Sequence, residues 1–195
     1  GCKVIRKQYL LSPNGLARIA PYAEAYGVKV GIEIHNPETP NSPAMMAYRA
    51  AIDKSGSKYI GFVPDFGCFA TKPNKPHWDE ALKNGADLRL LEMARDMRYD
   101  AVPMEEAQKR LKENGATTLE LALLQEMYAF LQFKKDCKKE LEGLKEIMPH
   151  CFHMHGKFHY LYEDLTEASI PYEEILNVVK ESDYNGYIVS EYEDH

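Results

Sequence analysis

Hydrophobic residues recur along the chain in two alternating periods. Short runs with strand-like alternation are separated by longer stretches that carry apolar residues at helical spacing. This alternation is typical of βα units on a parallel sheet. The expected strands are residues 3–8, 28–35, 59–66, 151–158 and 187–193. The pattern therefore predicts an α/β protein built around a parallel sheet.

Local start and stop signals support the helices between these strands. Gly27 follows an amphipathic stretch and is expected to end it, because glycine adopts the left-handed conformation found after helices. Ser42 followed by Pro43 is a typical helix start, which predicts a helix that runs to about Ser55. A further helix is expected over residues 171–182.

The alternation of strand and helix patterns is interrupted between the third and fourth strands. Residues 67–150 exceed what a loop and one helix need in a βα unit. We interpret this segment as an insertion that is mostly helical, with a Pro- and Lys-rich loop at 71–78 and one long helix at 119–148. Its first loop leaves directly from the third strand, which predicts that the insertion lies at the carboxyl-terminal mouth of the strands.

Alternation within each strand separates an apolar face from a face with ionisable residues. Ile32 and Ile34 lie on one face of the second strand, and Glu33 lies on the other. The other strands repeat this arrangement near their carboxyl ends, with Asp65 in the third, His153, His155 and Lys157 in the fourth, and Glu191 and Glu193 in the fifth.

A single carboxylate at a strand end is more often a solvated loop residue, and a single histidine is more often structural. Placement in phase on four successive strands favours a functional site, because sites are built at the carboxyl ends of parallel strands. Carboxylates with one imidazole suit a hard divalent cation: Mn²⁺ above all, with Mg²⁺ or Co²⁺ as alternatives. Such an ion polarises a carbonyl oxygen beside a transferred proton.

Composition narrows the functional classes. The 195 residues include 24 Lys and Arg against 30 Asp and Glu, a formal charge of −6 that disfavours a nucleic-acid partner. No stretch has the apolar length of a membrane span, which predicts no membrane association. The four cysteines are scattered, so we expect reduced thiols and a cytoplasmic location. One domain over residues 1–195 is expected from the length.

Four motifs together resemble a known family. They are Val30-Gly31-Ile32-Glu33-Ile34-His35, Val63-Pro64-Asp65-Phe66-Gly67, His153-Met154-His155-Gly156-Lys157 and Gly186-Tyr187-Ile188-Val189-Ser190-Glu191-Tyr192-Glu193. In order and spacing they are similar to the last strands of the xylose-isomerase-like TIM barrels, the sugar phosphate isomerase/epimerase superfamily. The resemblance implies strands 4–8 of a (β/α)₈ barrel, with the 67–150 insertion between strands 6 and 7 and without the first three βα units.

The resemblance also implies roles for individual residues. The metal ligands would be Glu33, Asp65, His155 and Glu191, and the two glutamates would also be the catalytic acid and base, as in the ketose epimerases of the family. Expected contacts to substrate are His35, Lys157, Arg6 and Trp78. Within the fourth strand, His153 is expected to lie deeper as a neutral structural residue, and Lys157 at the rim.

Two departures from the family pattern leave alternatives open. Many members have a histidine shortly after the ligand aspartate, where this chain has Gly67 and Cys68. The large insertion is also unusual for a simple epimerase. Metal-dependent subunits of C-glycoside deglycosidases share this barrel, act with a small partner subunit and use a histidine base, a role that His35 or His153 would take here.

These observations lead to ranked functional hypotheses. The first is a divalent-metal-dependent isomerase or epimerase of a sugar or sugar derivative, acting as a homo-oligomer or with a small partner subunit. The alternatives are the metal-binding subunit of a C-glycoside deglycosidase, a carbon–carbon lyase, and an inactive fragment. A DNA-repair enzyme is disfavoured by the negative charge. Trp78 is expected to form a sugar-stacking wall or, more simply, to pack into the core of the insertion.

Overall fold

The computed structural model describes residues 1–8 and 11–193, which form two compact units. The first, here called the sheet unit, comprises Gly1–Cys68, Lys138–Lys157 and Tyr172–Glu191. The second, the helical unit, comprises Phe69–Cys137, Phe158–Pro171 and the residues from Tyr192 onward. Each unit is described by itself below.

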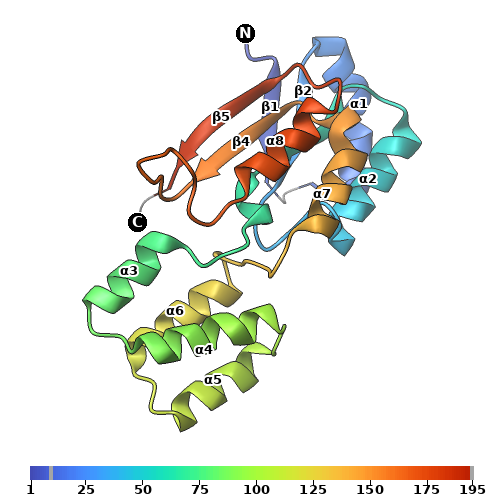
Figure 1. Ribbon diagram of the computed structural model, residues 1–195. Helices are drawn as coiled ribbons and strands as arrows, with labels where there is room; N and C mark the ends of the chain where they lie inside the picture. The colour runs from blue at the N-terminus through green and yellow to red at the C-terminus, as the bar shows by residue number, and fades with distance from the viewer. Residues whose placement is uncertain (9–10, 194–195) are drawn as a thin grey trace. The chain divides into compact units, whose positions relative to one another are not determined.

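Three parallel strands form the first part of the sheet unit (Figure 1). They are β1 (Val4–Lys7), β2 (Lys29–Ile34) and β3 (Ile60–Pro64), in that spatial order. The central strand β2 is buried on both faces apart from its first residue, because helices cover one face and the polar cluster described below lies on the other. All three expected strands are present, each two or three residues shorter than the pattern predicts.

The helices of this part begin and end where the sequence predicts. Helix α1 (Pro13–Tyr26) has Ser12 as its N-cap, whose hydroxyl accepts a hydrogen bond from the Gly15 amide, and it ends at Gly27 with φ of 61°. Helix α2 (Pro43–Ser55) begins directly after Ser42. The two helices pack against each other and against β3, which buries the apolar face of the strands.

The second part of the sheet unit consists of two further strands with their helices. They are α7 (Lys138–Ile147), β4 (His153–Phe158), α8 (Tyr172–Lys180) and β5 (Tyr187–Tyr192). In Figure 1, β4 and β5 lie side by side and point in the same direction. Parallel bridges from Phe62 to Cys151 and from Asp65 to His155 connect β3 to β4. The strands so described do not form a closed barrel.

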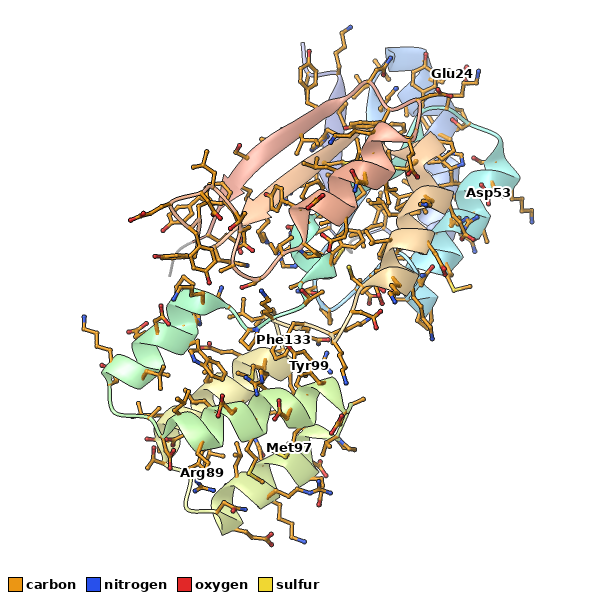
Figure 2. The ribbon with its side chains drawn as sticks, in the orientation of Figure 1. Glu24, Asp53, Arg89, Met97, Tyr99 and Phe133 are labelled. Atoms are coloured by element: carbon orange, nitrogen blue, oxygen red, sulfur yellow. The ribbon has the colours of Figure 1, made fainter. Side chains whose placement is uncertain are left out.

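The helical unit contains four α-helices between β3 and α7. They are α3 (Lys75–Lys83), α4 (Leu88–Tyr99), α5 (Met104–Glu113) and α6 (Thr118–Tyr128). Their inward faces form a separate apolar core that includes Leu91, Leu124 and Phe133. Figure 2 labels Tyr99 and Phe133, whose rings meet edge to face with centroids 5.3 Å apart.

The expected single helix over residues 119–148 is wrong. Two helices, α6 and α7, occupy this stretch, and the chain between them is not helical. Helix α6 ends at Tyr128, and Phe133 then turns into the apolar core of the helical unit with an exposed fraction of 1%. Burial of Phe133 therefore breaks a helix that apolar periodicity alone would continue.

In the part of the chain that the structure describes, every helix is too short or too polar to span a lipid bilayer.

Candidate functional site

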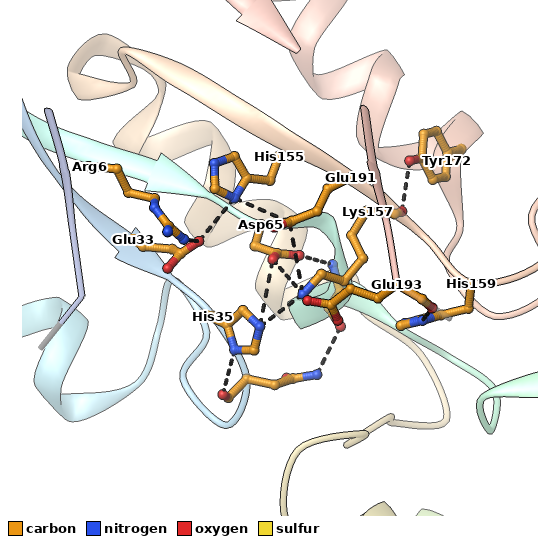
Figure 3. A network of polar contacts seen from close by, with 12 residues as sticks. Arg6, Glu33, His35, Asp65, His155, Lys157, His159, Tyr172, Glu191 and Glu193 are labelled. Carbon is orange, nitrogen blue, oxygen red and sulfur yellow. Dashed lines mark hydrogen bonds and ion pairs between the residues drawn. The ribbon is translucent and has the colours of Figure 1, made fainter. Parts of the chain in front are cut away.

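Four side chains that the sequence singles out meet at the carboxyl ends of the strands. Glu33 is near the end of β2, Asp65 directly follows β3, His155 lies in β4 and Glu191 lies in β5. Parallel pairing brings these ends to one edge of the sheet. Figure 3 shows the four side chains pointing toward one another, away from the helices.

The distances within this cluster are short. His155 Nδ1 lies 2.9 Å from Glu33 Oε1 and 3.3 Å from Glu191 Oε2. Glu33, Asp65 and His155 each present one ligand atom within 4.8 Å of the others, and all three residues are buried. The structure thus brings together the four residues that the resemblance implies as metal ligands.

Lys157 and His35 form a second polar group that contacts the first. Lys157 Nζ lies 2.9 Å from Asp65 Oδ2 and 2.8 Å from His35 Nε2. His35 Nδ1 lies 2.9 Å from the Asn36 carbonyl oxygen. Because that carbonyl can only accept, Nδ1 must carry the proton, and Nε2 therefore accepts from the Lys157 ammonium. His35 is held in one tautomer with its basic nitrogen at the cluster.

The loop after β3 fixes Asp65, and sequence analysis missed the residues that do this. The Gly67 amide donates to Asp65 Oδ1 at 2.7 Å, and Asn36 Nδ2 donates to the Gly67 carbonyl at 3.1 Å. A Cβ on Gly67 would come within 3.0 Å of Lys157 Cδ, so a larger residue would displace the lysine. The signal was present, because an aspartate two residues before a glycine is typical of a side-chain-capped turn.

Burial and charge act in opposite directions on the ionisable groups. Burial raises the pKa of Glu33, but the contacts with His155, Arg6 and Gln8 outweigh it and lower that pKa from 4.5 to about 2. The contact with Glu33 raises the pKa of His155 above 6.5 against the effect of burial. For His153, which is partly exposed, burial lowers the pKa, which favours the neutral imidazole; its expected deeper position stays a prediction.

Three of the expected substrate contacts have defined surroundings. Lys157 is not at the rim as expected: its side chain is 4% exposed, because the ammonium turns inward to Asp65. Arg6 Nη1 binds Glu33 Oε1 at 2.6 Å, and its side chain is 41% exposed. Trp78 belongs to the helical unit, where it packs against that unit's apolar core. A role in substrate binding stays a prediction for all three, as it does for His35.

The donor set of the cluster suits a divalent cation. Ligand atoms that share one ion at 2.0–2.4 Å are at most about 4.8 Å apart, which is the spread that Glu33, Asp65 and His155 show. Glu33 Oε2 is buried, and none of the described residues donates a hydrogen bond to it. A buried carboxylate oxygen without a donor is costly unless a cation binds it. The residues present therefore fit a metal ion.

Comparison with known proteins agrees with this geometry. A family model described as the xylose isomerase-like TIM barrel matches residues 10–195. The 3'-dehydrocarminate deglycosidase alpha subunit of Microbacterium sp. is 28% identical over 99% of this chain and 58% of its own length. A C-glycoside deglycosidase alpha subunit of Arthrobacter globiformis is 28% identical over 92% of this chain and 51% of its own. The chain thus spans just over half the length of these relatives.

Among solved structures, the crystal structure of a D-tagatose 3-epimerase-like protein aligns with a TM-score of 0.46 and 19% sequence identity, covering 97% of this chain and 55% of that chain. The family model, in contrast, extends over nearly the whole sequence and matches the resemblance that the four strand-end motifs predict. The chain therefore belongs to the xylose isomerase-like TIM-barrel family.

Proposed function

We propose that the chain carries the metal site of a C-glycoside deglycosidase alpha subunit, which cleaves the carbon–carbon bond between an oxidised sugar and its aglycone. The relative from Arthrobacter globiformis carries this name, as does one from Microbacterium trichothecenolyticum that is 26% identical over 99% of this chain, and the relative from Microbacterium sp. is named a 3'-dehydrocarminate deglycosidase alpha subunit. The expected carbohydrate substrate and small partner subunit belong to this proposal.

The observation that carries the proposal is the orientation of His35. Its Nε2 accepts a hydrogen bond from Lys157 and faces the cluster, whereas its Nδ1 is anchored on a backbone carbonyl. A neutral imidazole held in this way is suited to general-base catalysis near neutral pH. Oε1 of Glu33, in contrast, forms ion pairs with Arg6 and His155.

The bond changes follow from these roles. His35 Nε2 takes the proton from the carbon next to the 3-oxo group, and the electrons of that C–H bond form a carbon–carbon double bond. The bond between the anomeric carbon and the aglycone breaks, its electron pair leaves with the aglycone carbon, and that carbon takes up the proton that His35 Nε2 removed. Lys157 turns from His35 to the substrate's carbonyl oxygen, which frees the base and stabilises the developing negative charge.

Glu33, Asp65, His155 and Glu191 would hold the divalent ion, Mn²⁺ being the first choice with Mg²⁺ or Co²⁺ as alternatives. When bound, that ion would supply positive charge beside the substrate's carbonyl oxygen. Arg6 would keep Glu33 ionised and ready as a ligand. His155 would hold the ion as the neutral imidazole.

A second candidate function is sugar isomerisation or epimerisation. It is favoured by Glu33 and Glu191, which flank His155 Nδ1 at 2.9 and 3.3 Å, as two carboxylates that could exchange one proton across a substrate. Glu191 is 32% exposed at its side chain and so accessible to a ligand.

The two functions are separated by paired substitutions in the protein together with its partner subunit. We expect His35→Gln to slow aglycone release from a 3-oxo C-glycoside by about 10²- to 10⁴-fold with the metal still bound. The matched control His153→Gln should change the rate by no more than about threefold. If His35→Gln keeps the rate and Glu191→Gln abolishes deuterium exchange into a ketose, the epimerase function is correct instead.

A further inference from the structure

The helical unit contains a pocket of about 580 Å³ that the proposed function does not use. It is formed by the loop at residues 72–73, helices α3 and α4, and residues 162–168. A volume in this range suits a small organic ligand. All of its lining residues lie within the helical unit.

Aromatic and apolar side chains make up about half of the lining of this pocket, and charged side chains make up the other half. Three rings line it, those of Trp78 on α3, Tyr99 on α4 and Tyr162 on the later loop, together with Pro73, Leu88 and Ala168. Flat rings of this kind prefer to stack on, or meet edge to face, another aromatic ring. The three rings therefore favour a planar aromatic group, and the charged residues of the lining favour a polar substituent on it.

Hydrogen bonds within the helical unit hold these walls in place. The Tyr99 hydroxyl donates to the Thr71 carbonyl at 2.9 Å, and the Ser169 hydroxyl donates to the Pro73 carbonyl at 2.8 Å. Tyr162 is braced by Tyr160, whose ring meets it edge to face at 5.4 Å. Fixed walls lower the ordering cost of binding, because fewer side chains lose freedom when a ligand enters.

The basic side chains that line the pocket differ in whether they already form ion pairs with nearby carboxylates. Lys75 forms an ion pair with Asp79, and Arg95 forms ion pairs with Asp96 at 2.8 Å and Glu92 at 3.7 Å. Lys72, an exposed residue of the same lining, makes no hydrogen bond or ion pair with the residues that the structure describes. The three cations and three anions of the lining cancel in sum, and Lys72 is the cation among them that no described residue pairs directly, so its ammonium is open to an anionic group.

We propose that this pocket binds a planar aromatic carboxylate, with the ring against Trp78, Tyr99 and Tyr162 and the carboxylate on Lys72. The proposal is independent of the metal cluster and of the reaction assigned to it, because all of its residues belong to the helical unit. The proposal assigns Trp78 a different role: it stacks on the aromatic ligand of this pocket and does not form a wall of the sugar site.

The sequence provides its own reporter for the test. Trp78 is the one tryptophan among the 195 residues, so a ¹⁵N-labelled sample gives a single indole N–H resonance. Two matched probes are titrated against the protein while that resonance is followed: 2-naphthoate, which is anionic, and 2-naphthamide, its neutral isostere.

We expect both probes to shift the indole resonance, with 2-naphthoate binding about threefold more tightly because of one partly solvated ion pair. Lys72→Gln should remove that advantage and leave 2-naphthamide binding unchanged, whereas Lys112→Gln on α5 should have no effect. Tyr162→Ala should weaken both probes by about tenfold.

Three results would overturn the proposal. The first is an indole resonance that neither probe moves at millimolar concentration. The second is equal binding of the acid and the amide to the unsubstituted protein. The third is a loss of 2-naphthoate affinity in Lys112→Gln as large as that in Lys72→Gln, which would indicate non-specific attraction by the surface charge.

Discussion

Two buried glutamates, one in each unit, have similar burial and similar acidity but opposite surroundings. Glu33 in the sheet unit is 0% exposed and Glu120 in the helical unit is 1% exposed. The pKa of each is lowered from 4.5 to about 2 against the effect of burial. What differs is the kind of donor that each carboxylate faces.

Glu120 accepts hydrogen bonds from neutral backbone and hydroxyl donors, and both of its oxygens are used. Oε1 accepts from the Asp87 amide at 2.7 Å, and Oε2 accepts from the Thr117 amide at 2.8 Å and the Thr117 hydroxyl at 2.6 Å. The carboxylate thereby satisfies the first turn of α6 and ties it to the start of α4. Glu120 therefore has a structural role that involves no partner outside the folded chain.

Glu33 instead faces charged side chains with one oxygen, and its other oxygen has no donor among the described residues. The comparison teaches a general distinction. A buried carboxylate whose two oxygens both accept hydrogen bonds from the protein stabilises the fold. A buried carboxylate with one oxygen that accepts none is arranged to bind a ligand.

The largest expected effect is on metal affinity at Glu33. Glu33→Gln should weaken Mn²⁺ binding by about 100-fold or more, because it removes a ligand charge from the cluster. The metal-free protein should unfold at an unchanged or higher temperature, since functional clusters of like charge reduce stability. Isothermal titration calorimetry and thermal unfolding measure the two quantities. Glu120→Gln should leave Mn²⁺ affinity unchanged, and a loss there would contradict the distinction.

The next largest effect is on the stability of the helical unit. Glu120→Ala should lower its free energy of unfolding by about 2–4 kcal/mol, because buried donors at Asp87 and Thr117 lose their acceptor. Urea denaturation followed by circular dichroism provides the value. The control is Glu113→Ala at the exposed end of α5, for which we expect a change within about 0.5 kcal/mol.

The acidity of Glu120 also predicts a pH dependence. Its folded pKa of about 2 lies below the ordinary value of 4.5, so ionised Glu120 stabilises the fold fully above pH 4.5 and this contribution is lost as the pH falls toward 2. Urea denaturation of the unsubstituted protein and of Glu120→Gln across this range tests the sign. If Glu120→Gln loses stability just as steeply, another carboxylate is responsible.

The smallest expected effect concerns Arg6. Its side chain is 41% exposed, so its ion pair with Glu33 is partly screened by water. Arg6→Met should change the free energy of unfolding by less than about 1 kcal/mol and should raise the pKa of Glu33. A pH titration of the Glu33 carboxyl by ¹³C NMR checks the direction. A large loss of stability would place Arg6 among the structural residues instead.

Much of the sheet unit follows from local sequence signals. Gly27 and the Ser42–Pro43 pair set helix boundaries because their backbone preferences act within one turn, and the strand pattern predicts which side of β2 carries Glu33. The convergence of Asp65 and His155 also follows, since parallel strands end at a common edge. The sequence therefore predicts which residues meet.

The details that it does not predict depend on distant contacts. The inward turn of Lys157 requires Asp65 and His35, and His35 lies 122 positions away along the chain. The end of α6 depends on a core that only the assembled helices form around Phe133. The role of Glu120, in contrast, was open to prediction, because Thr117 and Glu120 have the spacing of a capping box before an apolar run.

The chain path through the helical unit limits how this protein can be altered. That unit is assembled from residues 69–137, 158–171 and the stretch from Tyr192 onward, and backbone bonds such as Thr71 N to Ser169 O join the first two stretches. Removal of residues 69–137 alone would leave the 158–171 loop without its partner. The four helices therefore cannot be removed as one continuous segment without affecting the other segments that complete the unit. Gain or loss of the helices during evolution requires accompanying changes in those segments, which separate parts of the gene encode.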